Sequence, residues 1–323
     1  MSAPVLAALL TAAATIAVPR RLPLHRAQPA TAAGVLLLAL LVRALLMVAI
    51  SVLALLRLSE FHVVEGALSW CWHELLPDLP GALGFAEHSV SHAVVAAPLA
   101  LLAGSVAWLA ARQVRAWRLL RRSLAGSTGT GPWGSTVVHD DAVLLAVTKL
   151  GRGRVLVSDK ALGELDGGEL AAGITHELAH LHRRHRAVLA VAALLGAVAR
   201  LLPGTRATKR ALSFQLERDA DAYVVHKLND PLALASAICK AGARSPSAAL
   251  VTLTGGTGSA VLRVRELLEG AAVRSRKVEL AARFTLVVLT LAALALVSSA
   301  PTWATPADAR AERPGSHNCS HDR

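Results

Sequence analysis

Aromatic, sulfur-containing and acidic residues are scarce in this chain. Aromatic side chains make up 3% of the 323 residues, with a single tyrosine. The three cysteines, Cys71, Cys239 and Cys319, form no C-x-x-C pair, which excludes a zinc knuckle and a dithiol redox motif. Only 22 Asp and Glu residues stand against 34 Lys and Arg, so the formal net charge is +12. Hydrophobic residues make up 54% of the chain, which is typical of a membrane protein rather than a soluble enzyme.

The apolar runs predict four transmembrane helices, at about 3–18, 32–56, 91–111 and 280–299. Basic residues follow the first and third runs, whereas the connection at about 59–88 carries five acidic residues and no Lys or Arg. Because basic flanks favour the cytoplasmic side, we expect a multi-pass protein of the cell membrane with both termini external. The basic clusters are thereby explained, so the sequence gives no reason to expect direct nucleic-acid binding.

This topology divides the chain into four parts. Residues 1–111 form an N-terminal membrane region with three helices and the external loop at about 59–88. Residues 112–278 form a cytoplasmic domain, 279–300 hold the fourth helix, and 301–323 form a short external tail. The predicted fold class is therefore a mainly α membrane protein with a cytoplasmic α+β domain.

Two features of the apolar segments have alternative interpretations. Arg43 lies within the second predicted span, where a charge is a functional candidate. We favour the simpler interpretation that its side chain reaches back toward the cytoplasmic face. Residues 187–202 are apolar but short for a span, and a single crossing would move later residues to the other side of the membrane. We expect a helix buried in the domain or lying against the bilayer.

The central motif is His176-Glu177-Leu178-Ala179-His180. In a helix, His176 and His180 lie one above the other on one face, where two imidazoles can bind one zinc ion. Glu177 is then placed to act as general base on a zinc-bound water. Asp166 and Glu169 form a capping box that predicts where this helix begins. Short strands are predicted before it, at about 136–141, 143–147 and 154–158, in a small antiparallel sheet.

A third metal ligand is expected on the next helix, at about 205–228. Glu217 and Asp221 are four residues apart and share a face of that helix. Two histidines and one glutamate leave the fourth zinc position open, as in catalytic sites, with Asp221 orienting a ligand histidine. The alternative is an ordinary charged helix surface. We interpret His182 and His185 as solvated or lipid-facing residues and not as further ligands.

These motifs resemble the H-E-x-x-H plus E-x-x-x-D pattern of membrane gluzincins. That group includes the BlaR/MecR-type antirepressor peptidases and the HtpX and CAAX prenyl protease relatives. The layout of spans, strands and a last span is most similar to the BlaR/MecR type. The resemblance implies a cytoplasmic zinc-peptidase domain with one Zn²⁺ per chain, held by His176, His180 and Glu217. It also implies that Glu177 is the base and Asp221 a supporting residue.

One departure from the resemblance is that no large penicillin-binding sensor domain follows the last span. The expected function is a zinc endopeptidase that cuts a cytoplasmic protein, with a transcriptional repressor or the chain itself as candidate substrates. The alternatives are an HtpX-like quality-control protease and a signalling or scaffold protein with a structural zinc. The intact Glu177 argues against a structural site, which would not need that carboxylate.

Other roles stay open at this stage. Tyr223 and His226 are candidate donors to the oxyanion of a tetrahedral intermediate, although each has a structural role as its simpler interpretation. Cys71 and Cys319 are both on the predicted external side, where a disulfide is permitted. His73, His317 and His321 offer a weak external metal site as the alternative. The sequence leaves the oligomeric state undetermined.

Overall fold

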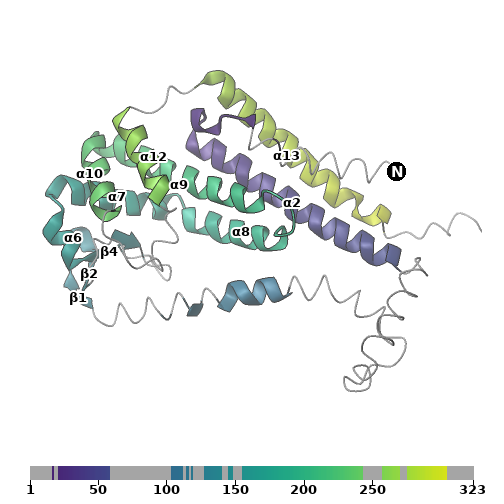
Figure 1. Cartoon of the computed structure of the whole chain (residues 1–323), viewed down its shortest axis with the longest axis horizontal. Helices are drawn as coiled ribbons and strands as arrows, with labels where there is room; N and C mark the ends of the chain where they lie inside the picture. Colours follow the sequence, from purple (N-terminus) through teal and green to yellow (C-terminus); the bar gives the residue numbers. More distant parts are fainter. Residues whose placement is uncertain are drawn as a thin grey trace, which may run out of the picture.

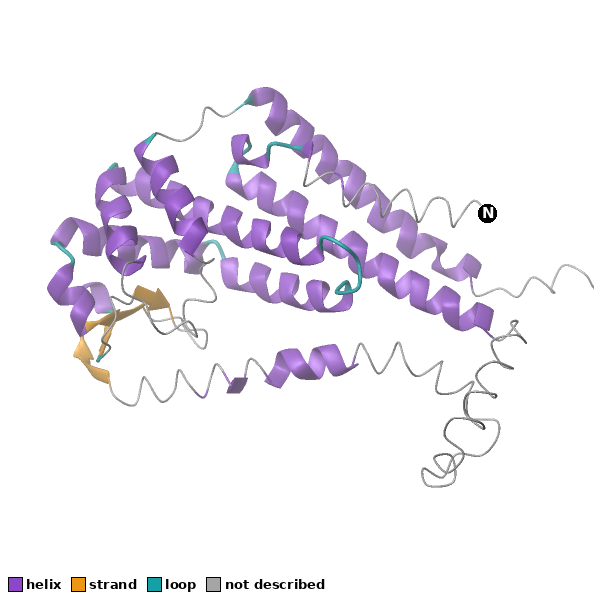
Figure 2. Ribbon diagram, in the orientation of Figure 1, coloured by secondary structure: helices purple, strands orange, loops and turns teal. Residues whose placement is uncertain are grey.

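The fold was analysed in a computed structural model (Figure 1), which describes residues 17, 21–58, 103–111, 114, 115, 118, 127–139, 145–147, 155–242, 257–269 and 275–303. The described chain is mainly helical, as predicted. Long helices run side by side over most of its length, and a small sheet lies at one end (Figure 2). The metal-binding motif lies on the helices next to this sheet.

Two helices are long and apolar enough to cross a membrane. They are α2 (Pro29–Leu58) and α13 (Arg276–Trp303), with candidate spans at Pro29–Ser51 and Arg276–Val297. Near their first residues, Glu279 accepts hydrogen bonds from the Gln28 backbone N–H and the Thr31 hydroxyl. The two helices are therefore parallel, as Figure 1 shows. They coincide with the second and fourth predicted spans, and the predicted topology requires these two to run in the same direction.

The remaining membrane predictions fall mostly outside the described residues. The first predicted span, the external loop at 59–88 and the tail at 301–323 lie there almost entirely, together with Cys71, Cys319 and the three external histidines. Of the third predicted span, residues 103–111 are described and are helical. Four transmembrane helices and the orientation in the membrane therefore stay predictions.

The helices α8 (His185–Val198) and α9 (Thr205–Leu228) form a hairpin that packs along α2. Most of segment 187–202 thus belongs to α8, a helix partly buried against its neighbours. Leu212 and Leu216 of α9 share one core with α2 residues such as Leu36 and Leu40. This core joins α9, the helix that carries Glu217, directly to a candidate membrane helix.

Arg43 does not reach back toward a surface, so that interpretation is wrong. Its side chain is 1% exposed in the middle of α2, and its Nη1 donates a 2.8 Å hydrogen bond to Oγ1 of Thr208 on α9. A guanidinium is costly to bury, and it is tolerated here because α9 supplies a polar partner.

The sheet has the order β1-β2-β4-β3 and is mixed, not antiparallel as predicted. Strands β2 (Thr136–Val138) and β4 (Val155–Ser158) are parallel, and β3 (Leu145–Val147) is antiparallel to β4. The unpredicted β1 (Ser127–Thr130) lies in a segment rich in Gly, Ser and Thr and pairs with β2. A 3₁₀ turn, η2 (Pro132–Gly134), connects β1 to β2, so these turn residues belong to a hairpin.

The helix that carries the central motif is α7 (Gly167–His182), which follows the short α6 (Asp159–Glu164). The predicted capping box is present, with reciprocal hydrogen bonds between Asp166 and Glu169. Gly173 faces β3 closely, because a Cβ on it would lie 2.3 Å from Cδ1 of Leu145. The glycine thus lets the sheet edge approach the motif. Helices α10 (Pro231–Gly242) and α12 (Thr257–Leu268) cover the other side, and Cys239 on α10 is exposed.

The hydrogen bond between Arg43 and Thr208 is testable by Thr208→Val. The substitution removes one acceptor from a buried guanidinium and should lower the free energy of unfolding by about 1.5–3 kcal/mol. Thermal unfolding of the full chain in detergent measures this. Thr290→Val is the matched control, because the Thr290 hydroxyl bonds only to its own helix at Leu286. Equal transition temperatures for the two variants would contradict the account.

Candidate metal centre

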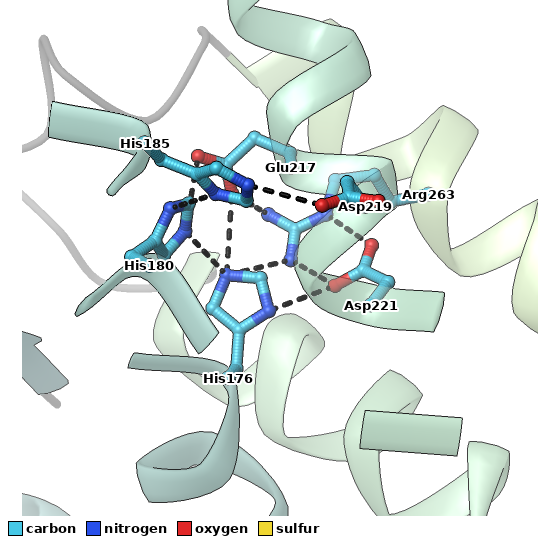
Figure 3. Close-up of polar contacts among 7 residues, drawn as sticks. All are labelled: His176, His180, His185, Glu217, Asp219, Asp221 and Arg263. Carbon is cyan, nitrogen blue, oxygen red and sulfur yellow. Dashed lines mark hydrogen bonds and ion pairs between the residues drawn. The ribbon is translucent and has the colours of Figure 1, made fainter. Parts of the chain in front are cut away.

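The helices α7 and α9 bring His176, His180 and Glu217 together into one buried group. Their ligand atoms all lie within 4.8 Å of one another. The two Nε2 atoms are 3.2 Å apart, and Nε2 of His176 is 3.3 Å from Oε2 of Glu217 (Figure 3). Nε2 of His180 is 3.6 Å from Oε1 of the same carboxylate. Two imidazole nitrogens and a carboxylate oxygen at this spacing fit zinc as three protein ligands.

Asp221 takes the place expected for a residue that orients a ligand. Its Oδ1 lies 3.0 Å from Nδ1 of His176, on the side of the ring opposite the ligand group. A carboxylate at Nδ1 keeps the proton there, so the Nε2 lone pair points to the metal position. The i, i+4 spacing of Glu217 and Asp221 thus places both carboxylates against the same histidine.

His185 is part of the centre, so its interpretation as a solvated or lipid-facing residue is wrong. It is 3% exposed, its Nδ1 is 2.9 Å from Nδ1 of His180, and its Nε2 is 3.0 Å from Oδ2 of Asp219. Because a carboxylate only accepts, His185 donates to Asp219 and accepts from His180. His182 is exposed, as expected.

The sequence contained a signal for His185 that the motif analysis did not use. Arg184 has φ 52°, which ends α7 and turns the chain so that His185 lies back under His180. Asp219 is buried on α9 and is also held by Arg183 at 2.6 Å. Asp219 lies between Glu217 and Asp221 in the sequence, and a buried carboxylate at that position needs a basic partner, which His185 supplies together with Arg183.

Arg263 is the second residue that sequence reasoning missed. It lies on α12, its side chain is 8% exposed, and it donates two 2.7 Å hydrogen bonds to Asp221. Its Nη1 is 2.9 Å from Oε2 of Glu217, so one guanidinium pairs with both carboxylates. No local sequence pattern predicts this contact, because Arg263 follows Asp221 by 42 residues and belongs to another helix.

Burial and neighbouring charges shift the pKa values within the centre in different directions. Burial alone would lower the pKa of His176, but the contacts with Asp221 and Glu217 raise it to about 9. Burial and the charge of His176 lower the pKa of His180 to about 3. Burial would raise the pKa of Glu217, yet His176 and Arg263 hold it at about 2. Burial raises the pKa of Glu177 to about 7. Glu177 is thus suited to exchange a proton near neutral pH.

Tyr223 and His226, the two candidate oxyanion donors, lie away from the ligand group. Tyr223 packs near His182, with Arg183 and Lys227 over its ring. His226 follows Glu217 by nine residues, which at about 100° per residue is about two and a half turns of the helix. The two side chains therefore leave α9 on opposite faces. His226 instead lines a cavity of about 450 Å³ between α9, α12 and the segment before α2. None of the described contacts gives either residue a catalytic role.

Comparison with known proteins supports a metallopeptidase. Residues 113–244 match the model of Peptidase family M48, and no curated protein and no solved structure matches the chain. The matched segment contains His176, Glu177, His180, Glu217 and Asp221, together with the newly placed His185 and Asp219. Helix α12 with Arg263 lies beyond it. The match is coarser than the BlaR/MecR-type assignment and does not select that type.

The raised pKa of His176 predicts that zinc binding displaces a proton. With a pKa of about 9, His176 is protonated at pH 6.5 in the metal-free protein, whereas a zinc ligand must be neutral. His180, with its lowered pKa, is already neutral there. Calorimetric titration of the metal-free protein with zinc, in buffers of different ionisation enthalpy, should therefore show release of about one proton. Heats that do not depend on the buffer would contradict the prediction.

The contact between His185 and His180 predicts an effect on metal affinity. His185→Leu removes the acceptor that fixes the His180 ring, and we expect zinc affinity to fall about tenfold. His182→Leu is the control, because that histidine is exposed two residues after His180. Competition with a zinc chelator measures both variants. If they bind zinc equally well, His185 does not support the ligand.

Proposed function

We propose that this chain, whose residues 113–244 match the Peptidase family M48 model, is a membrane-anchored zinc endopeptidase. The observation that carries the proposal is the position of Glu177 beside a buried set of two histidines and one glutamate. The candidate spans on α2 and α13 supply the membrane anchor. We further propose the cell membrane as its location, with the peptidase domain on the cytoplasmic side.

The donor set favours a catalytic site over a structural one. Structural zinc sites are closed by four protein ligands, most often Cys and His, whereas catalytic sites use three. His185 is the nearest further histidine, but its two nitrogens are engaged by His180 and Asp219. Among the described residues, the ligand group consists of His176, His180 and Glu217. This leaves a position for water or a substrate carbonyl and argues against the scaffold alternative.

Glu177 performs the proton transfers in the proposed reaction. When bound, zinc lowers the pKa of a bound water and polarises a peptide carbonyl. Glu177, with its pKa raised to about 7, accepts the proton of the attacking water. The same carboxyl then donates the proton to the nitrogen of the leaving amine, which returns Glu177 to its starting state. No covalent intermediate with a Ser or Cys is needed.

The residues around the ligands hold their side chains in position. Asp221 orients His176, and the chain from Asp219 through His185 orients His180. Arg263 keeps the carboxylates of Glu217 and Asp221 ionised and fixed in place. Each ligand therefore arrives preorganised, which lowers the cost of binding metal.

The edge strand β3 supports the binding of an extended peptide. Among the described strands, β3 pairs with β4 alone and packs against α7 at Gly173. Its other edge is thus available for strand addition beside the ligand helix, with backbone hydrogen bonds that need no particular sequence. This supports a protein substrate that presents an unfolded segment.

We propose two alternative classes of substrate. A cytoplasmic protein, with a transcriptional repressor or the chain itself as candidates, follows from the expected orientation of the domain. An HtpX-like role in the quality control of membrane proteins is equally compatible with the family match and the site. Persistence of the uncleaved repressor in cells that lack the protease would support the first class. Accumulation of misfolded membrane proteins would support the second.

The roles of the two glutamates are separable by substitution. Glu177→Gln should keep bound zinc but lower the rate of cleavage by about 10²–10⁴-fold, because only the base is lost. Glu217→Gln should lose zinc, because it removes an anionic ligand. Zinc content and cleavage of casein or of the chain itself are measured on the purified full chain in detergent. Glu269→Gln, at an exposed glutamate directly after α12, is the control. Unchanged cleavage by Glu177→Gln would overturn the proposal.

A further inference from the structure

The first half of α9 carries two exposed arginines on the same side of the helix as the metal ligand. Arg206 and Arg210 are exposed, and no ion pair joins either one to another described residue. Arg206 precedes Glu217 by eleven residues, and Arg210 precedes it by seven. Because each residue turns the helix by about 100°, both arginines point within about 20° of the direction in which the Glu217 side chain leaves the helix axis. The three side chains therefore form one row along α9, which leads from the metal centre toward the hairpin turn.

The opposite side of α9 is occupied by other helices. Thr208 and Leu212 are buried against α2, and the aliphatic part of Lys209 lies close to Gly196 of α8. Arg206 and Arg210 are exposed because this packing uses the other faces of the helix. Arg186, at the start of α8, interacts electrostatically with Glu177. Arginines thus lie both along the row and beside the carboxylate next to the ligand group.

This row of arginines contrasts with the other exposed surfaces of the helical bundle. The exposed side chains of α8 are apolar, including Val191 and Leu194, and those of α13 include Phe284 and Leu291. Such surfaces suit lipid tails or apolar helices, whereas unpaired arginines in contact with lipid tails are costly. The face with Arg206 and Arg210 therefore suits water or a polar, negatively charged partner.

The spacing of the row matches an extended peptide that passes through the metal centre. At 1.5 Å per residue, Arg210 and Arg206 lie about 10 Å and about 16 Å from Glu217 along the axis. An extended chain advances about 3.3 Å per residue, so these distances correspond to about three and five residues. The arginines are separated by about 6 Å, close to the distance between alternate residues of a strand, which share one face.

We propose that Arg206 and Arg210 are specificity-determining residues that bind acidic side chains of the substrate. The preferred substrate has Asp or Glu at the third and fifth residues on one side of the cleaved bond. Arg210 contacts the nearer acidic residue and Arg206 the farther one. This inference rests on the proposed peptidase function, and it names the substrate class for that same site.

The test measures cleavage preferences of the zinc-loaded full chain in detergent. The probe is a library of decapeptides with randomised positions, whose cleavage products are identified by mass spectrometry. Wild type should enrich Asp and Glu at the third and fifth positions. Arg210→Gln should lose the preference at the third position only, and Arg206→Gln at the fifth only. The pair Arg265→Gln and Lys277→Gln is the charge-matched control, because both residues are exposed on other helices.

A single acidic peptide from the library provides the quantitative readout. Each substitution should lower kcat/KM about three- to fivefold through KM, as expected for an exposed ion pair. The preference should also weaken in 0.5 M salt, which screens such pairs. The double variant Arg206→Glu/Arg210→Glu should reverse the preference toward Lys and Arg at the same two positions. A merely structural role would not produce this reversal.

The outcomes separate the inference from the proposed function. Cleavage by wild type without an acidic preference, or a preference retained by both variants, would overturn the inference and leave the peptidase intact. Absence of cleavage by the zinc-loaded wild type would overturn both. Micelles of an anionic phospholipid are added in a parallel measurement. If they change the activity only when the two arginines are present, while peptide preferences stay equal, the face binds lipid headgroups and the inference is wrong.

Discussion

The contact between one buried histidine and two carboxylates, balanced by one arginine, determines the arrangement of this protein. His176 on α7 lies against Glu217 and Asp221 on α9, and Arg263 on α12 pairs with both acids. Three buried charged groups without these partners would be strongly unfavourable, so the three helices must meet in this register. The sheet edge, the capping box and the packing of α8 and α9 on α2 all serve to bring the helices to this point.

Helix α9, which carries the candidate ligand Glu217, is also connected to the candidate membrane helix α2. Arg218, the neighbour of Glu217, donates hydrogen bonds to Glu266 of α12, to Gln215 and to the backbone carbonyl of His25 just before α2. Farther along, Arg43 of α2 bonds to Thr208 of α9. Two buried arginines therefore hold α9 against α2. One contact lies near the start of α9, at Thr208, and the other lies near its middle, at Arg218.

The sequence predicted the parts of the site that depend on local spacing. The four-residue periodicity of a helix was sufficient for His176 with His180 and for Glu217 with Asp221, and the capping box placed the start of α7. It was not sufficient for contacts made by the tertiary fold. His185 depends on the left-handed turn at Arg184, and Arg263 comes from a helix far along the chain. The sheet was misjudged because the parallel pairing of β2 with β4 depends on a crossover, which strand patterns do not encode. Arg43 was misjudged because its polar partner, Thr208, lies 165 residues away.

The most direct test of the account is the coordination of the bound metal, measured by X-ray absorption at the zinc edge on the purified full chain. The account predicts nitrogen and oxygen neighbours only, at about 2.0–2.2 Å, with two imidazole signatures and an exchangeable water. The number of imidazoles should fall to one in His180→Ala and stay at two in His185→Gln. Three imidazoles or a sulfur neighbour in the wild type would mean a site closed by protein ligands. That result would contradict the assignment of a catalytic centre.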